Sequence, residues 1–380
     1  MGDCFTERCE SMPDGELISV TINDGIKKFS ELGRHDNSND DKSKYKKVCA
    51  GDIAYNSMRM WQGASGCSPY EGIVSPAYTV LTPNSGINSK CMAYQFKLPA
   101  TIHTFKINSQ GITSDNWNLK FPALSEIEIY VSPYEQEQAK IAAYFANLDH
   151  LITLHQRKFD KLQVLKKAML EKMFPKNGSS VPEIRFKGFT DAWEQRKLAE
   201  ISGKVTEKNT GLQYVETLTN SAEFGIISQR DFFDHDISKL GSLDGYYIVR
   251  NEDFVYNPRI STSAPVGPIN RNKLGRTGVM SPLYTVFRPH DIDTTYLEHF
   301  FKCGYWYSFM NFNGDSGARS DRFSIKDDVF FQMPIPVPHI EEQRKIGLFL
   351  TQLDHLITLH QRELEKLQNI KKSMLEKMFV

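Results

Sequence analysis

The sequence has 380 residues, 40% of them hydrophobic, which is enough for two or more domains with real cores. Lys plus Arg and Asp plus Glu each number 46, so the formal net charge is zero, which excludes a uniformly basic nucleic-acid coat but leaves room for local basic patches. No apolar run approaches 18 residues, and charged residues interrupt the first 20 positions, so we expect no signal peptide, no membrane span and a cytoplasmic location.

The order of the predicted elements gives an α+β fold with five segments. They are a first globular domain at 1–133, a long helix at 134–174, a linker at 175–190, a second globular domain at 191–337 and a second long helix at 338–380. Within the globular domains we predict strands at 53–55, 78–81, 127–131, 246–249, 254–256, 284–287 and 329–331, and helices at 89–96 and 296–310. Six scattered cysteines without a CxxC pair predict reduced thiols and no metal site.

The most informative feature is an internal duplication. Residues 148–174 read LDHLITLHQRKFDKLQVLKKAMLEKMF, and residues 353–379 match them at 21 of 27 positions with an offset of 205. Weaker matches join 72–80 to 278–286, 52–56 to 253–257 and 5–8 to 205–208. The chain therefore contains two copies of one unit, each a globular part followed by a helix, with far more divergence in the globular parts.

The two helices carry a heptad pattern of apolar residues, which is typical of coiled coils. The predicted helix-pairing residues are Leu148, Ile152, Phe159, Leu162, Leu353, Ile357, Leu364 and Leu367. A second apolar row (Leu151, Leu154, Leu165, Leu356, Leu359, Ile370) widens this face. The residues allow either direction of pairing; we predict an antiparallel pair that separates the two globular domains and gives a pseudo-twofold repeat.

Catalytic motifs are missing from the sequence. There is no GxxxxGK[ST] phosphate loop, GxGxxG, HExxH or GxSxG. Asn257-Pro258-Arg259 lacks the second proline and the aromatic residue of an adenine-methyltransferase loop, and Ile18 stands where a nuclease site would need lysine. We therefore expect no catalytic residues and no metal bound by this chain.

Local charge gives the candidate nucleic-acid contacts. Residues 254–290 contain five basic and no acidic residues, and residues 53–124 carry a milder excess of three positive charges. Both stretches are rich in the polar and aromatic side chains that contact bases and phosphates. The predicted DNA-binding residues are Arg59, Trp61, Gln62, Asn116, Trp117, Lys120, Arg259, Arg271, Lys273, Arg276, Arg319 and Arg322.

Two variable globular parts, each followed by a nearly identical long helix, resemble the specificity subunit of type I restriction-modification systems. The most specific parts are residues 334–343 leading into LDHLITLHQR, the segment 181–198, and the duplicated KKxMLEKMF ends. The resemblance implies two target recognition domains that each read half of a split double-stranded DNA sequence. It also implies two methylation subunits, which use S-adenosylmethionine, and two restriction subunits, which use ATP and magnesium, as partners of a non-catalytic chain.

One departure from this pattern lies at the start of the first unit. Residues 191–198 open the second globular domain, but only four residues precede 5–8, so we expect the first domain to lack an opening segment such as an edge strand. A second hypothesis is a coiled-coil structural adaptor whose globular parts bind protein. A third is a combined nuclease or methyltransferase in one chain, which no motif supports.

Overall fold

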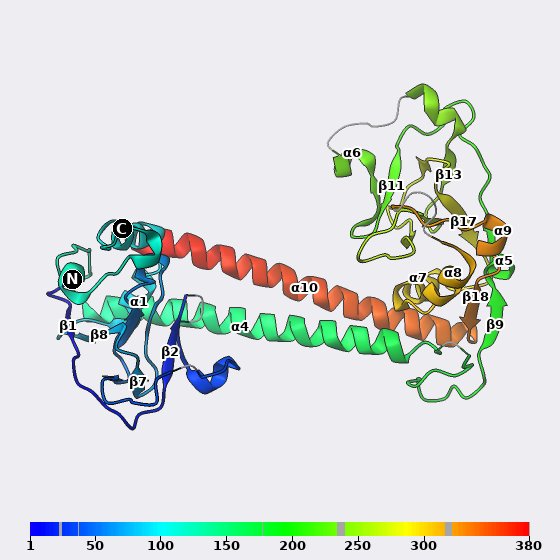
Figure 1. Cartoon of the computed structure of the whole chain (residues 1–380). Helices are drawn as coiled ribbons and strands as arrows, with labels where there is room; N and C mark the ends of the chain where they lie inside the picture. The colour runs from blue at the N-terminus through cyan, green and yellow to red at the C-terminus, as the bar shows by residue number, and fades with distance from the viewer. Residues whose placement is uncertain (23–24, 37, 177, 234–239, 316–320, 380) are drawn as a thin grey trace. The chain divides into compact units, whose positions relative to one another are not determined.

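The protein is described by a computed structural model that covers residues 1–22, 25–36, 38–176, 178–233, 240–315 and 321–379 (Figure 1). It divides into unit 1, Met1–Arg157 with Gln361–Val380, and unit 2, Lys158–His360. Each unit thus contains one globular part together with one end of each long helix. The boundaries of the five predicted segments stay predictions, because this division runs through both helices. Within the part of the chain that is described, no helix is long and apolar enough to span a bilayer.

Unit 1 is built on an antiparallel four-stranded sheet with the strand order β1-β8-β5-β6, next to the two-stranded sheets β2-β3 and β4-β7. Phe5, Ile53, Tyr55, Phe96 and Phe105 are fully buried on one side of it. The strands are β1 Phe5–Glu7, β2 Ile18–Thr21, β3 Gly25–Lys28, β4 Lys46–Val48, β5 Ile53–Asn56, β6 Ser65–Cys67, β7 Gly72–Val74 and β8 Tyr78–Pro83. The helices are η1 Phe29–Leu32, η2 Met60–Gln62, α1 Ser89–Gln95, α2 Pro99–Ile107, η3 Ser114–Asn116 and α3 Phe121–Ser125.

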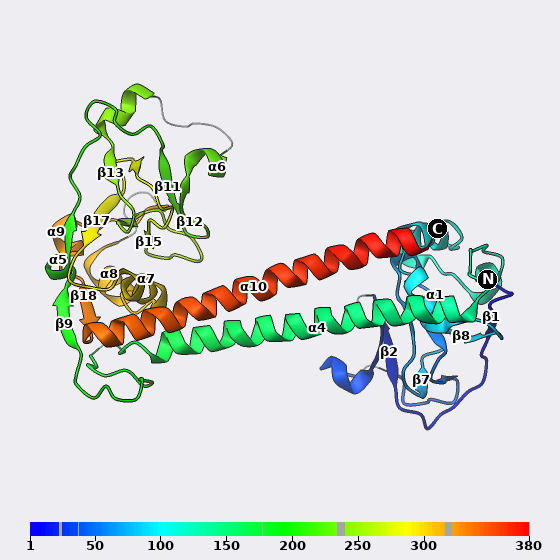
Figure 2. The same ribbon diagram turned by 180° about the vertical axis from the view of Figure 1, so that it is seen from behind.

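Unit 2 repeats this plan with the sheet β10-β17-β14-β15 and the pairs β11-β12 and β13-β16, and it adds the pair β18-β9 (Figure 2). The strands are β9 Glu194–Lys197, β10 Ser202–Lys204, β11 Leu218–Ser221, β12 Gly225–Ser228, β13 Tyr247–Val249, β14 Phe254–Tyr256, β15 Ile269–Arg271, β16 Gly278–Met280, β17 Thr285–Pro289 and β18 Pro334–Val337. The helices are α5 Leu198–Ile201, α6 Gln229–Phe233, η4 Leu240–Gly245, α7 Thr294–Cys303, α8 Tyr307–Asn313 and α9 Asp327–Phe330.

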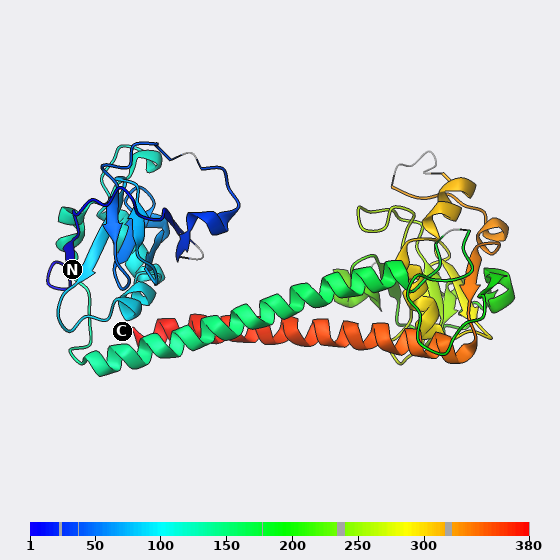
Figure 3. The same ribbon diagram turned by 90° about the horizontal axis from the view of Figure 1, so that it is seen from below.

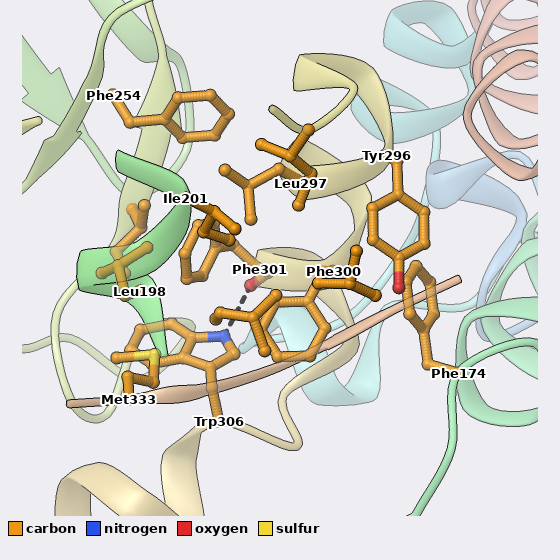
Figure 4. Packing of buried hydrophobic residues seen from close by; sticks show 14 of the residues in the cluster. Phe174, Leu198, Ile201, Phe254, Tyr296, Leu297, Phe300, Phe301, Trp306 and Met333 are labelled. Atoms are coloured by element: carbon orange, nitrogen blue, oxygen red, sulfur yellow. Dashed lines mark hydrogen bonds between the residues drawn. The ribbon is translucent and has the colours of Figure 1, made fainter. Parts of the chain in front are cut away.

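The core of unit 2 is dominated by aromatic rings (Figure 4). Phe174, Trp193, Tyr296 and Phe300 form a chain of ring contacts with centroids 5.4 to 6.4 Å apart. Trp306 donates its indole N–H to the carbonyl of Phe301 at 2.9 Å, which satisfies a polar group that burial would otherwise leave unpaired. The core thus extends from the end of the first long helix to the sheet.

The two long helices are α4 Glu135–Lys172 and α10 Ile340–Met378. At about 1.5 Å per residue each is roughly 60 Å long. Glutamates occupy the first turn of each helix and a lysine the last turn, which favours the helix dipole at both ends. Neither helix contains proline, and α10 contains one glycine, Gly347. The sequence therefore supports one continuous helix in each case.

The helices run antiparallel within each unit (Figure 3). In unit 1, Lys371 of α10 pairs with Asp149 of α4. In unit 2, Lys166 of α4 pairs with Asp354 of α10. Because Asp149 and Asp354, like Lys166 and Lys371, are 205 residues apart, these two ion pairs are the same contact made twice. The fold prediction of an antiparallel pair with an internal repeat is confirmed.

The predicted pairing residues lie on the covered faces of the helices. Leu148, Leu353 and Leu364 are buried at 8%, 5% and 8% exposure, and the other five are half-buried. The second apolar row behaves differently, since Leu151, Leu154, Leu165, Leu356 and Leu359 are 40 to 45% exposed. The row of the eight predicted pairing residues, which we call the helix seam, is therefore enough for pairing. The second row of leucines remains available on the surface of each unit.

A buried glutamine anchors the start of each long helix to its globular part. The side-chain oxygen of Gln138 accepts a hydrogen bond from the backbone N–H of Asn88, the N-cap residue of α1, at 2.8 Å. The side-chain oxygen of Gln343 accepts a hydrogen bond from the backbone N–H of Asp293, the N-cap residue of α7, at 2.9 Å. The two glutamines are again 205 residues apart, so both units fix their helix by the same device.

Three of the predicted elements were wrong in whole or in part. Residues 329–331 belong to α9 and its end, where buried Phe330 packs with the helix. The helix predicted at 296–310 is split into α7 and α8, because Gly304 takes a φ of 78° that ends α7. Residues 127–131 form no strand although they alternate between covered and exposed positions, because none of the strands found in the described residues of unit 1 pairs with them. The other predicted strands and the helix at 89–96 are present, within a few residues of the expected bounds.

A buried histidine should make unit 2 sensitive to acid. Burial lowers the pKa of His299 to about 3, with Lys302 and Lys166 opposing its charging while Asp354 and Glu298 favour it. Because an unfolded histidine titrates near 6.5, the unfolded state binds the extra proton first, and stability falls as pH drops below 6.5.

We expect the free energy of unfolding of unit 2 to fall by about 1 kcal/mol per pH unit between pH 6 and pH 5. In His299→Gln this loss should largely disappear. Urea unfolding of both proteins at pH 7, 6 and 5 measures the loss of free energy of unfolding, and hydrogen exchange of the α7 amides reports on unit 2. Equal slopes for the two proteins would contradict the assignment.

Candidate nucleic-acid interface

Two loops meet at one edge of the unit 2 sheet. Residues 257–261 follow β14, and residues 321–323 join them through two backbone hydrogen bonds. The N–H of Phe323 donates to the carbonyl of Pro258 at 2.8 Å, and the N–H of Ile260 donates to the carbonyl of Asp321 at 3.0 Å. We call these two segments the unit 2 loop pair. The contact brings Arg259 and Arg322 into direct backbone apposition. Two predicted DNA-binding residues that are 63 positions apart in sequence thus lie side by side.

An asparagine network positions the unit 2 loop pair. The side chain of Asn257 accepts from the backbone N–H of Arg259 at 3.0 Å and donates to the carbonyl of buried Asn220 at 2.8 Å. Asn270 in turn donates to the side chain of Asn220 at 2.7 Å. Gly267 has a φ of 86°, and a Cβ there would lie 2.1 Å from the carbonyl oxygen of Asn257, so only glycine permits this turn. The backbone that carries Arg259 is therefore fixed.

A cavity of about 310 Å³ opens beside this network, lined by Asn220, Ser221, Asn257, Arg259, Tyr284 and Arg322 among others. A second hollow of about 480 Å³ shares Tyr284 and Arg322 with it. Arginine and asparagine side chains make bidentate contacts to guanine and adenine edges, and arginine also binds phosphate. The arrangement therefore offers the donors and acceptors that DNA recognition requires.

Unit 1 contains the corresponding two loops. Residues 57–62 follow β5, and residues 116–120 join them through a hydrogen bond from the N–H of Leu119 to the carbonyl of Ser57 at 2.9 Å. We call these segments the unit 1 loop pair. Trp61 and Trp117 meet edge to face, with centroids 5.2 Å apart. Six of the predicted residues lie here: Arg59, Asn116 and Lys120 are exposed, and Trp61, Gln62 and Trp117 are half-buried.

The charges of both loop pairs are free of acidic partners within the described residues. Arg59 and Lys120 in unit 1, and Arg259 and Arg322 in unit 2, form no ion pair with any described Asp or Glu. The ammonium of Lys106 lies 5.6 Å from the ring of Trp117 and adds another cation to the unit 1 loop pair. Such cations can be satisfied by DNA phosphates or base edges.

Three of the predicted DNA-binding residues form ion pairs inside unit 2, and their role in DNA binding stays a prediction. Arg271 is bonded to Glu252 at 2.9 Å and to Glu298 at 2.7 Å, and its side chain is only 10% exposed. Lys273 also pairs with Glu298, and Arg276 forms a two-bonded pair with Glu216. The stretch 254–290 has no acid of its own, but acids from other segments fold against it. A local charge count could not detect them.

Glu298 is the centre of this ion cluster. Burial alone would raise its pKa, but Lys302 and Lys273 outweigh burial and hold the pKa at about 2. The carboxylate therefore stays charged at neutral pH and needs its cations. The cluster stabilises α7 against β15 and leaves little positive charge for DNA.

We therefore predict that Arg271→Ala destabilises unit 2 by about 1–3 kcal/mol, because it removes bonds from a buried carboxylate. The folded variant should bind DNA as the unchanged chain does, with the same salt dependence. Thermal unfolding and DNA titration at three salt concentrations measure both effects. A normal melting temperature with weaker DNA binding would restore Arg271 to the interface.

The remaining predicted residue, Arg319, lies outside the described residues. Sequence reasoning missed Tyr284, Asn220 and Lys106. Tyr284 lies in the repeated segment 278–286, at the start of the strand predicted at 284–287. Lys106 contributes to the positive excess of residues 53–124, and Asn220 carries no sequence signal beyond its residue type. Among the described residues, no three His, Cys, Asp or Glu side chains gather as a metal ion would require.

Comparisons with known proteins agree with this geometry. A family model described as "Type I restriction modification DNA specificity domain" matches residues 22–164 and 190–369, one match in each half of the chain. The type I restriction enzyme MjaVIII specificity subunit of Methanocaldococcus jannaschii is 23% identical over 358 residues, covering 88% of this chain and 81% of the relative. The putative MjaX specificity subunit of the same organism is 24% identical over 382 residues, covering 93% and 84%.

One solved structure supports the fold. A type I restriction-modification S subunit from M. genitalium aligns over 100% of this chain and 94% of its own, with a TM-score of 0.54 and 14% sequence identity. This likeness covers both units and both long helices. The adaptor hypothesis is not favoured, because both halves of the chain match a DNA specificity domain.

Proposed function

Because the chain belongs to the family of type I restriction modification DNA specificity domains and is a DNA sequence-recognition subunit of such a system, we propose that it reads a split, asymmetric target in double-stranded DNA. Unit 1 would read one half-site through residues 57–62 and 116–120, and unit 2 the other through residues 257–261 and 321–323. One observation carries this proposal. In both units, which differ in sequence, the loop that follows a central strand is hydrogen-bonded to a second loop, and the basic side chains there have no acidic partner among the described residues.

The divergence of the loop pairs fits this division of labour. Unit 1 presents two tryptophans with Arg59 and Lys120, whereas unit 2 presents asparagines with two arginines. Different side chains on one scaffold suit two different half-sites. The helices, in contrast, are nearly identical in both copies, which suits a constant spacer and constant docking sites.

We further propose that the chain is non-catalytic and cytoplasmic, and that it binds no cofactor itself. Two methylation subunits would bring S-adenosylmethionine, and two restriction subunits would bring ATP and magnesium. The half-exposed leucines supply a docking face for the methylation subunits, with Leu151 and Leu154 in unit 1 and Leu165, Leu356 and Leu359 in unit 2. The face recurs in the two copies, with half-buried Ile370 of unit 1 at the place of Leu165, and two similar faces fit two equal partners.

Genome-wide mapping of N6-methyladenine tests the proposal. Cells carrying this chain with its cognate methylation subunit should show a split motif with an unspecified spacer, and the motif should vanish when this chain alone is deleted. Replacing residues 257–261 and 321–323 by those of a related subunit should change one half-site and leave the other unchanged. Methylation that persists after deletion would contradict the proposed function.

A further inference from the structure

A short turn in front of β17 presents a leucine on the surface of unit 2. Pro282 and Leu283 form the turn, which is closed by a hydrogen bond from the N–H of Tyr284 to the carbonyl of Ser281 at 3.1 Å. Leu283 is 60% exposed. A single exposed leucine is ordinary on a protein surface, so its surroundings decide whether it has a role.

The sister turn of unit 1 shows that the fold does not need this leucine. There Pro76 and Ala77 lead into β8, and the N–H of Tyr78 donates to the carbonyl of Ser75 at 3.0 Å. Ala77 holds the place of Leu283 and is exposed as well. Because the same turn forms with alanine, the larger side chain of Leu283 is not required for the turn or for the core.

Leu283 lines both of the hollows beside the unit 2 loop pair. The first, of about 310 Å³, has Arg259 and Arg322 in its wall, and the second, of about 480 Å³, has Arg322 and Tyr284. The leucine therefore lies among the side chains that offer contacts to phosphates and base edges. It is an apolar group at a place where the other candidate contacts are polar.

The bases of DNA offer one apolar group in the major groove, which is the C5-methyl group of thymine. Arginine and asparagine recognise guanine and adenine by hydrogen bonds, and neither side chain distinguishes thymine by its methyl group. An apolar side chain does, because contact with the methyl group removes apolar surface of both from water. A leucine beside two arginines therefore adds a kind of base recognition that the arginines lack.

We propose that Leu283 is a specificity-determining residue of unit 2 and contacts a thymine of the half-site through the 5-methyl group of that base. The proposal rests on the proposed function, because it takes unit 2 as the reader of one half-site. Ala77 presents a smaller apolar group at the same place of unit 1, which fits a second half-site that is read differently.

Uracil in place of thymine tests the proposal, because it removes the methyl group and leaves the hydrogen-bonding groups of the base pair in place. Methylation mapping gives the motif, and exchange of the unit 2 loop pair identifies its half-site. Each thymine position of that half-site is then changed to uracil in a synthetic duplex. We expect one replacement to weaken binding by the chain and its methylation subunit about fourfold, as the loss of one buried methyl group would. In Leu283→Ala the thymine and uracil duplexes should bind equally.

Leu348→Ala is the matched control. Leu348 lies on α10 of unit 2, is 59% exposed and is not among the residues that line either hollow. This variant should keep the full difference between the thymine and uracil duplexes. The melting curve of Leu283→Ala should match that of the unchanged chain, since the sister turn already contains alanine.

Three results would overturn the proposal. They are a thymine preference of unchanged size in Leu283→Ala, a half-site in which no uracil replacement weakens binding, and an equal loss on both duplexes. The last would make Leu283 a wedge between base pairs, which does not depend on the methyl group. Failure of the proposed function is a distinct result that overturns both proposals, because the unchanged chain would then prefer no duplex over another.

Discussion

Replacing Arg259 and Arg322 together by alanine should weaken binding of the cognate DNA by about 100-fold or more. Each arginine contact to a base or phosphate contributes about 1–3 kcal/mol, and a factor of ten corresponds to about 1.4 kcal/mol. Both side chains belong to the unit 2 loop pair, and neither has an acidic partner among the described residues. Their removal therefore affects the DNA complex more than the free protein.

The matched control is Arg250→Ala. This change also removes one positive charge from unit 2, but Arg250 is an exposed residue that pairs with Glu207 at 2.9 Å, and such surface pairs contribute little. Its DNA affinity should stay within about threefold of the unchanged chain. Because the double variant removes two positive charges and the control removes one, a loss of binding free energy that is equal per charge removed would mean that only total charge matters, and the unit 2 loop pair would lose its proposed role.

Salt dependence separates the two ways in which these arginines can act. If they contact phosphates, the slope of log affinity against log salt should become shallower by about one per lost contact. If they read bases, the slope should stay while methylation spreads to altered half-sites. In either case the other half-site, assigned to unit 1, should keep its sequence, and Arg59→Ala should show the reverse pattern.

The sequence was sufficient for the long helices because their information is local. The heptad spacing, the near absence of helix breakers and the duplication at an offset of 205 all lie within continuous segments. The duplication even accounts for the interhelix ion pairs of Asp149 and Asp354, which are copies of one contact. The residues alone allow the helices to pair in a parallel or an antiparallel direction, and the structure shows the antiparallel pair.

The features that the sequence did not show share a different cause, which is that the deciding partner lies far away in the chain. Residues 127–131 have the alternation of a strand, but a strand also needs a neighbour, and unit 1 offers none among its described residues. Arg271 sits in an acid-free stretch, yet Glu298 folds against it from α7. Arg259 and Arg322 were identified separately, and only the fold shows that they form one site. Local patterns thus predict elements better than they predict which charges remain free.

Replacing Leu364 by aspartate should have the largest effect on the scaffold. Leu364 is 8% exposed in the helix seam of unit 1, so the change removes a buried side chain and places a carboxylate where water is excluded. We expect a loss of about 3–5 kcal/mol in the stability of unit 1 and loss of protection of α4 and α10 in hydrogen exchange. The neighbouring ion pair of Asp149 and Lys371 should become more sensitive to salt as the seam opens.

Leu154→Asp is the matched control for this experiment. It introduces the same side chain into the same pair of helices in unit 1, but Leu154 is 45% exposed. Its melting curve and hydrogen exchange should resemble those of the unchanged chain, while its binding to the methylation subunit should weaken if the exposed leucines form the docking face. Equal destabilisation by the two changes would show that the seam is wrongly assigned. Full docking by Leu154→Asp would move the partner to another surface, because a carboxylate at the centre of an apolar contact opposes association.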